Sequence, residues 1–432
     1  MEIKRDKYLN EIISKKENGL IKVITGLRRS GKSYLLNKLY MNYLLKQNIQ
    51  KKQIIQFAFD NMEDIMKLDN YLPKEASIKY NSRKNYTVNA KKFLLYISDL
   101  TKEKTNYYIL LDEVQLLENF VITLNGLLNH DNFDVYVTGS NSKMLSKDII
   151  TEFRGRGDQI HIYPLSFEEY YQASNLSFDE AYMNYQYYGG MPYLLNLNTE
   201  ERKKEYLKQL FSEIYIKDIT EKNGIKDIDS FEKLLKVLAS SIGSYTNPSN
   251  LEKTFKSVEK ISYGHVAIKN HIENIKDSFL ISEAYRYDIK GKKYIGSNSK
   301  YYFTDIGLRN ALINFRQDEP RHIMENIIYN ELIIRGYSVD VGIVEVSVKN
   351  ENNNYVLKQL ETDFICNKIN EKIYIQSAYS FETLEKQMQE KRSLISINDN
   401  FRKIIIVKDN IKRYVTEEGI EVMCLKDWLL NN

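Results

Sequence analysis

The strongest constraint on this chain is the segment G-L-R-R-S-G-K-S at residues 26–33, which matches the phosphate-binding pattern G-x-x-x-x-G-K-[ST] at every fixed position. The apolar residues 20–25 before it predict a buried strand, and the apolar residues within 34–45 recur at helical spacing. A strand, a glycine-containing loop and a helix N-terminus together bind anions, because inward-turned N–H groups and the helix dipole both favour negative charge. We therefore expect a nucleotide to bind here.

Residues of this loop have separate expected roles at a nucleoside triphosphate. Lys32 is expected to reach the β- and γ-phosphates, and the hydroxyl of Ser33 to hold Mg²⁺. The side chains of Arg28 and Arg29 are expected to face solvent or protein, because such loops contact phosphate mainly through their backbone. The predicted ATP-contacting residues are Gly26, Arg28, Arg29, Ser30, Gly31, Lys32, Ser33 and Tyr34.

Length and composition are typical of a multidomain globular protein. A chain of 432 residues allows two to four domains, and 43% hydrophobic residues supply more than one core. No apolar run approaches the roughly 20 residues needed to cross a bilayer, and the N-terminus lacks an apolar signal core, so we expect a cytoplasmic protein without a membrane partner. The two cysteines predict no disulfide framework, and a net charge of +4 does not by itself indicate nucleic-acid binding.

A second motif follows the phosphate loop. Residues 107–111 predict an apolar strand, and it ends in Asp112 and Glu113, which is a Walker B pattern. Asp112 is expected in the magnesium shell, and Glu113 is expected to polarise the attacking water. The alternative is a buried strand that happens to end in two solvated carboxylates. The phosphate loop upstream disfavours that alternative.

Two further positions are candidates for contact with the γ-phosphate. The predicted strand 134–138 is followed by polar residues, of which Asn141 is the candidate and Ser140 the alternative; a simple turn is an equally good interpretation. Arg156 or Arg154, in the segment F-R-G-R-G at 153–157, is a candidate arginine finger, because a guanidinium stabilises charge on a transferring phosphoryl group. The alternative there is a solvated basic turn.

The order and spacing of these motifs resemble the archaeal-type AAA ATPase family of bacteria and archaea. The resemblance rests on residues 26–33, 110–115, 138–142, 155–156 and 163–167, and continues in Y-G-G-M-P at 188–192, Y-F-T-D-I-G-L-R at 302–309 and E-N-I-I-Y-N-E-L at 325–332. It implies an AAA-type doubly wound α/β sheet with a small helical lid, and it supports a nucleotide-responsive arginine at 155–156. Family members carry a C-terminal domain of unknown function.

Four segments are expected. An α/β ATPase core spans 1–166, a helical lid 167–224, a winged-helix-like region 225–316 and a nuclease-like α/β domain 317–432. The winged-helix prediction follows from three helical patterns before a hairpin pattern. Residues 225–300 hold 13 Lys/Arg and 9 Asp/Glu, and the basic hairpin between 285 and 300 is a candidate DNA contact through phosphates. The alternatives are a solvated sheet edge and a region that packs only on the ATPase.

The last segment resembles the PD-(D/E)XK nuclease fold. Glu325 stands for the helix acid and Asp363 for the strand aspartate, but Gln376 occupies the place of the next acid and no lysine follows it two residues later. A neutral amide is a poor ligand for a hard cation, so we expect a nuclease-like scaffold without competent chemistry. Glu331, Glu361 or a lysine from elsewhere in the chain are the residues that would restore it.

Together these patterns predict a Mg²⁺-dependent ATPase whose nucleotide cycle moves the C-terminal segments on DNA or on another protein. Water would attack the γ-phosphorus in line while Lys32, Mg²⁺ and an arginine spread the charge. Two alternatives are an ATP-gated binding module with negligible turnover, which Glu113 disfavours, and an ATP-regulated nuclease. An arginine that acts across a subunit interface would require a homo-oligomer.

Overall fold

The computed structural model describes residues 3–80, 86–139, 153, 155–316, 319–349 and 354–430. The chain divides into two compact units, Glu2–Pro164 and Leu165–Asn432. Within the described ranges, no helix combines the length and the apolar character that crossing a membrane needs.

The first unit is built on five parallel strands in the order β2-β5-β6-β1-β7. This confirms the expected parallel α/β sheet. The strands are β1 (Ile21–Gly26), β2 (Ile54–Ala58), β5 (Tyr107–Asp112), β6 (Phe133–Thr138) and β7 (Gly157–Ile162). A small separate hairpin consists of β3 (Ile78–Tyr80) and β4 (Tyr86–Val88), and the helices are α1 (Asp6–Ser14), α2 (Lys32–Tyr34), α3 (Met41–Lys46), α4 (Met62–Met66), α5 (Ala90–Leu100) and α6 (Phe120–Leu127).

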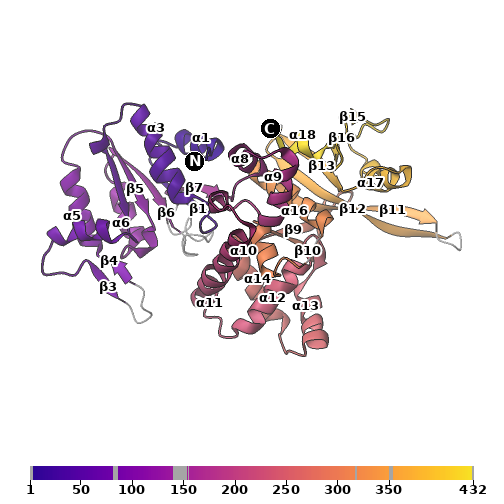
Figure 1. Cartoon of the computed structure of the whole chain (residues 1–432), viewed down its shortest axis with the longest axis horizontal. Helices are drawn as coiled ribbons and strands as arrows, with labels where there is room; N and C mark the ends of the chain where they lie inside the picture. The colour runs from indigo at the N-terminus through magenta and orange to yellow at the C-terminus, as the bar shows by residue number, and fades with distance from the viewer. Residues whose placement is uncertain are drawn as a thin grey trace. The chain divides into compact units, whose positions relative to one another are not determined.

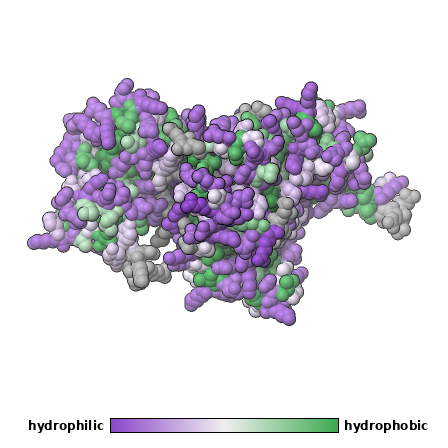
Figure 2. Space-filling view, viewed as in Figure 1, coloured by the Kyte–Doolittle hydropathy of each residue, from purple (hydrophilic) through white to green (hydrophobic). Residues whose placement is uncertain are grey.

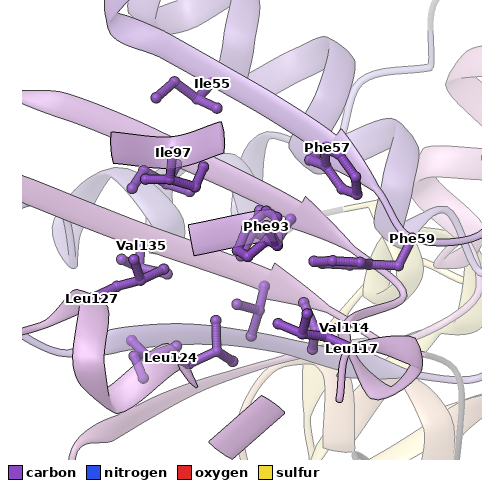
Figure 3. Close-up of a cluster of buried hydrophobic side chains, with 14 of the residues drawn as sticks. Ile55, Phe57, Phe59, Phe93, Ile97, Val114, Leu117, Leu124, Leu127 and Val135 are labelled. Carbon is purple, nitrogen blue, oxygen red and sulfur yellow. The ribbon is translucent and has the colours of Figure 1, made fainter. Parts of the chain in front are cut away.

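Both faces of this sheet are covered, which is why its strands are continuous apolar runs. Alternate residues of the central strands enter opposite cores: Val23 packs with residues of α5 and α6, whereas Ile24 packs with residues of α1 and α3. Helices lie on both sides of the sheet (Figure 1). In the first core Phe57, Phe59 and Phe93 form a mutual aromatic group with ring centroids 4.8–5.3 Å apart (Figure 3). The packing holds the carboxyl ends of β1, β2, β5 and β6 at one edge of the sheet.

The second unit begins with helices and ends in a mixed sheet. Its nine strands run in the order β15-β16-β14-β13-β12-β11-β9-β10-β8. The strands are β8 (Tyr245–Thr246), β9 (Ile281–Asp288), β10 (Lys293–Phe303), β11 (Ser338–Lys349), β12 (Tyr355–Lys368), β13 (Glu371–Ala378), β14 (Arg402–Val407), β15 (Tyr414–Val415) and β16 (Glu421–Cys424). Hydrophobic residues gather at the outer end of the β11–β12 hairpin, where Val356 and Leu357 are exposed (Figure 2).

Most helices of the second unit lie where the sequence predicted helices, whereas those at 306–312, 384–395 and 425–430 were not predicted. They are α8 (Phe167–Ser174), α9 (Phe178–Tyr188), α10 (Glu200–Gln209), α11 (Lys217–Asn223), α12 (Ile228–Ser240), α13 (Pro248–Thr254), α14 (His265–Asp277), α15 (Ile306–Leu312), α16 (Pro320–Ile334), α17 (Leu384–Ile395) and α18 (Leu425–Leu430). Residues 167–224 are helical and cluster with the C-terminal unit, so their role as a lid stays a prediction. The three helices α12, α13 and α14 precede the β9–β10 hairpin, which is the element order expected for a winged helix.

The β9–β10 hairpin is an internal part of the large sheet. Arg286, Tyr287 and Asp288 of β9 pair in parallel with 341–343 of β11, and β10 pairs with β8 on its other side. The hairpin is therefore flanked by β11 beside residues 286–288 and by β8 beside residues 299–300, and one sheet runs from the 225–316 segment into the 317–432 segment. Sequence spacing did not reveal this pairing, because it joins strands that are about 50 residues apart.

Two of the C-terminal segments with the family resemblance meet around one buried carboxylate. Asp305 caps α15 by accepting the Leu308 N–H at 3.0 Å, and it accepts the Gly190 N–H at 2.7 Å. A Cβ atom at Gly189 would overlap the Asp305 carboxylate, and one at Gly307 would overlap the Tyr188 carbonyl. The glycines therefore permit close contact between the end of α9 and the start of α15.

Neighbouring polar residues extend this junction to α12 and α16. The buried Arg309 donates to the Ala239 carbonyl at 2.7 Å and to Glu319 at 2.8 Å. The Asn310 side chain donates to the carbonyls of Gln186 and Tyr187, and Asn326 pairs with both main-chain groups of Phe303 at 2.8 Å. These motifs thus satisfy buried backbone groups where helices meet, which gives them a structural role.

Candidate nucleotide-binding site

The phosphate loop joins the end of β1 to the start of α2, and its two glycines are sterically required. Gly26 has φ +140°, and a Cβ atom there would overlap the Ile162 carbonyl oxygen on β7. Gly31 has φ +101° and precedes the first residue of α2, Lys32. Only glycine adopts such conformations without strain. The loop is therefore closed tightly against β7, with the helix N-terminus at its end.

Lys32 places a buried positive charge inside the loop. Its Nζ donates to the carbonyls of Gly26 at 3.1 Å and Leu27 at 3.0 Å. Burial lowers the pKa of Lys32 to about 8; the carboxylates of Glu113 and Asp112 oppose this effect, and Arg28 adds to it. The observed acceptors are neutral carbonyls, which compensate a buried cation only in part. An anionic phosphate fits this donor set.

The two acids at the end of β5 lie beside the loop, as predicted. Asp112 is buried and accepts hydrogen bonds from the Thr138 hydroxyl and, at 3.4 Å, from the Asn37 amide. Glu113 follows with φ +53°, a left-handed conformation that turns the chain out of the strand. The Gln115 amide donates to the Glu113 carboxylate. A single fixed carboxylate with Ser33 is the kind of set that binds Mg²⁺ together with phosphate oxygens and water.

Sequence reasoning missed two residues of this site, Thr138 and Asp60. Both follow from the strand order, because β5 lies between β2 and β6 and the carboxyl ends of these parallel strands meet. Phe59 donates its N–H to the Asp112 carbonyl at 3.0 Å, so Asp60 follows directly beside the acids. Partial burial, and then the charges of Glu113 and Asp112, raise the pKa of Asp60. Asp60 is thus a third carboxylate close to Asp112 and Glu113.

The arginine predictions have different outcomes. Arg28 and Arg29 are exposed, as expected, and Arg29 has φ +63°. The Arg156 carbonyl accepts from Ile21 N–H at 2.9 Å, which places Arg156 at the amino end of β1. The phosphate loop begins at the other end, roughly 16 Å away for five residues of strand. This position argues against Arg156 acting on a phosphate held by its own chain, and an action across a subunit interface stays a prediction.

Of the remaining residues predicted to contact ATP, the structure describes three in the phosphate loop and the helix after it. Ser33 is exposed at the start of α2, and Ser30 is fully buried. The Tyr34 hydroxyl accepts from the Ile3 N–H at 3.1 Å. Asn141, its alternative Ser140, and Arg154 lie outside the described residues.

The structure brings the acids of the predicted nuclease-like site together around Lys300. Asp363 on β12 accepts from the Ser377 N–H at 2.7 Å, and its own N–H donates to Gln376 at 3.3 Å. Lys300 on β10 bonds Glu325 at 2.8 Å and Glu361 at 2.7 Å. Burial, followed by the nearby Glu325, raises the pKa of Asp363 well above its usual range, which favours its neutral form.

The lysine beside these acids, Lys300, comes from β10, and its ammonium is paired with Glu325 and Glu361. Across the described ranges, no group of three or more His, Cys, Asp or Glu side chains is placed to hold a metal ion. Lys300 is buried and compensates the carboxylates as an internal cation. Glu331, the other acid considered, bonds Arg335 at 2.9 Å. The expected lack of nuclease chemistry stays a prediction.

The basic hairpin is only partly available to nucleic acid. Lys300 is buried, Arg286 donates to Gln359 at 2.8 Å, and Lys290 donates to the Glu345 carbonyl at 2.7 Å. Lys292 and Lys293, at the turn, are exposed. The charge excess of the hairpin therefore overstates the phosphate contacts that it offers.

Two family descriptions match the chain. Residues 18–171 match a family described as "AAA domain", and residues 179–319 match a domain of unknown function, DUF8612. The first range contains the phosphate loop and the acids at the end of β5. The second contains the helices from α9 to α15 and the β9–β10 hairpin.

Similar proteins include two that match along nearly their whole length. An "Uncharacterized protein" of Haemophilus influenzae is 33% identical over 435 residues, which cover 99% of this chain and 98% of the relative. "Uncharacterized protein MJ1544" of Methanocaldococcus jannaschii is 28% identical over 430 residues, which cover 94% of this chain and 85% of the relative.

Among solved structures, the ORC2 protein of Aeropyrum pernix aligns with a TM-score of 0.40 and 12% identity over 77% of this chain and 96% of that one. The ORC1 protein of Aeropyrum pernix in complex with DNA aligns with a TM-score of 0.33 and 10% identity over 73% and 93% of the two chains. The family assignment rests on the full-length sequence match, and the chain belongs to the family of the Haemophilus influenzae protein, with an AAA domain followed by the domain of unknown function DUF8612.

Proposed function

We propose that the first unit binds Mg²⁺–ATP and hydrolyses it. One observation carries this proposal: the Lys32 ammonium is buried inside a glycine-bounded loop, bonded to two neutral carbonyls and beside the two acids of β5. A buried cation next to a helix N-terminus is the complement of a phosphate chain. The match of residues 18–171 to an AAA domain supports the same assignment.

Some residues of the site would hold the phosphates and the metal, and others would orient the attacking water. Lys32 and the main-chain N–H groups of the loop hold the phosphates, and Ser33 with Asp112 would hold the metal. When bound, Mg²⁺ supplies positive charge that stabilises the transferring phosphoryl group. Glu113 orients the attacking water and accepts its proton, and Thr138 fixes the Asp112 carboxylate beside it.

The decisive experiment compares Glu113→Gln with the unaltered protein in a steady-state phosphate assay with Mg²⁺–ATP. We expect Glu113→Gln to lose at least about 100-fold in kcat while its affinity for ATP changes little, because the substitution removes the base and keeps the shape. Glu118→Gln is the matched control, since Glu118 pairs with Lys79 on the surface at 2.7 Å. Equal slow rates for all three proteins would instead favour an ATP-gated binding module without turnover.

We further propose that the nucleotide cycle acts on the second unit, and that DNA contacts it through the exposed lysines of the β9–β10 turn. Lys292 and Lys293 support this, and the buried Lys300 does not. Reversing both exposed charges to glutamate should weaken DNA binding and lower its dependence on salt, by about one unit of slope for each phosphate that the variant no longer binds. Lys102→Glu combined with Lys104→Glu, an equal charge change at two exposed positions of the first unit, is the control. Unchanged DNA binding in the double variant would exclude this surface.

A further inference from the structure

The N-terminal helix is attached to the phosphate loop by one buried arginine. Arg5 precedes α1, and its guanidinium donates through Nη1 to the Ser30 carbonyl at 3.1 Å and through Nη2 to the Tyr163 carbonyl at 2.7 Å. Its central carbon lies 4.5 Å from the centre of the Tyr8 ring, and the Tyr8 hydroxyl accepts the Tyr163 N–H at 3.3 Å. Arg5 is 4% exposed, so these contacts are shielded from water.

The contact with Ser30 determines where the next N–H group points. The Ser30–Gly31 peptide is trans and planar, so its C=O and N–H point in opposite directions. Because Arg5 holds the Ser30 oxygen on the side of α1, the Gly31 N–H is directed away from α1. Gly31 lies immediately before the buried Lys32, where a phosphate would be bound.

The contact with Tyr163 fixes the other side of the loop. Tyr163 follows β7, whose last residue, Ile162, closes against Gly26 at the start of the loop. One planar guanidinium thus bridges the end of the loop and the strand that supports its beginning. A lysine cannot make both bonds with the same geometry, because its ammonium lacks the rigid fork.

We propose that Arg5 is a positioning residue that preorganises the phosphate loop by holding the Gly31 N–H toward the nucleotide's β-phosphate. The inference rests on the proposed nucleotide function. Preorganisation strengthens binding because a loop that is already ordered in the free protein does not have to lose conformational entropy when the ligand binds. The effect is therefore specific for ligands that carry a β-phosphate.

The test is titration calorimetry of ATP, ADP and AMP with the full chain, its Arg5→Lys and Arg5→Ala variants, and a matched control. Lys15→Met is the control, because Lys15 anchors α1 to β7 by bonding Gln159 O at 2.7 Å and Asp158 at 2.8 Å, away from the phosphate loop. We expect Arg5→Lys to bind ADP about tenfold more weakly or worse, with AMP affinity and the control nearly unchanged.

Three results would overturn the proposal. The first is ADP affinity within twofold of the unaltered protein in Arg5→Lys. The second is an equal loss of ADP and AMP affinity in Arg5→Lys, which would show a general structural role; Arg5→Ala with thermal unfolding shows whether such a loss follows from stability. The third is that the unaltered protein binds neither ADP nor ATP, which would remove the proposed function itself and the inference with it.

Discussion

The hydroxyl of Thr138, at the end of β6, donates a hydrogen bond to the carboxylate of Asp112, at the end of β5. The bond orients the acid that would hold the metal, so Thr138→Val should lower the Mg²⁺-dependent ATPase rate by roughly tenfold, the effect of about 1.4 kcal/mol. Thr123→Val is the matched control, because the Thr123 hydroxyl bonds only carbonyls near the start of α6, at 3.2 Å and 3.4 Å. Equal rates for both variants would show that Asp112 needs no such support.

The lowered pKa of Lys32 predicts how nucleotide affinity depends on pH. Below its pKa of about 8, Lys32 is charged in the free protein and binds phosphate directly. Above pH 8 it is neutral, and binding requires uptake of a proton, so the affinity for ADP should fall about tenfold for each further pH unit. Calorimetry at pH 7, 8 and 9 measures this. A dissociation constant that is constant up to pH 9 would contradict the lowered pKa of Lys32.

The same group affects stability with a defined sign. Its folded-state pKa of about 8 lies below the ordinary value of 10.5, so the unfolded chain binds more protons between these values. The stability of the nucleotide-free protein therefore gains a contribution that rises from pH 8 to pH 10.5. Lys32→Met should remove that rise, as urea unfolding at several pH values would show.

Asp305→Asn should destabilise the second unit. The new amide nitrogen would face one of the N–H groups of Gly190 and Leu308 in place of an acceptor oxygen, which costs about 1–3 kcal/mol. Asp229→Asn removes only a surface pair with Lys233 and should be nearly neutral. Urea unfolding of the two variants measures the difference. If Asp305→Asn were as stable as the control, the junction would not depend on this carboxylate.

Lys300→Met tests whether the carboxylate cluster is structural. It would leave Glu325 and Glu361 without their cation in a buried site, at a cost of about 3–5 kcal/mol. Lys102→Met, at the surface beside Asp99, should cost little.

A nuclease assay examines the same cluster independently. We expect no cleavage when the unaltered protein is incubated with plasmid and Mg²⁺ or Mn²⁺. Cleavage that is lost on Asp363→Ala would show that the cluster retains nuclease chemistry, and it would contradict the role assigned to Lys300.

Sequence patterns predicted what is local and missed what depends on strand order. Residues 26–33 were informative because the strand before them and the helix after them are adjacent in the chain. Thr138 and Asp60 join the site only because β2, β5 and β6 are neighbours in space. Arg156 is close to the motifs in sequence but lies at the opposite end of β1.

The second unit shows the same limit. The expected order of helices and strands is present, and Asp363 and Gln376 meet as their neighbouring strands predict. The position of Lys300 depends on the alignment of the β9–β10 hairpin with β11, a long-range pairing without a local signal. Its charge counted toward a basic surface in the sequence, whereas in the structure it is buried.

The central claim is that the loop around Lys32 binds the phosphates of ATP, and equilibrium binding of Mg²⁺–ATP to the unaltered protein and to Lys32→Ala tests it most directly. We predict that Lys32→Ala loses at least about 100-fold in affinity for Mg²⁺–ATP, because it removes a buried charge paired with phosphate. Its midpoint temperature of thermal unfolding should be unchanged or raised. Equal affinity of the two proteins for ATP would contradict the account.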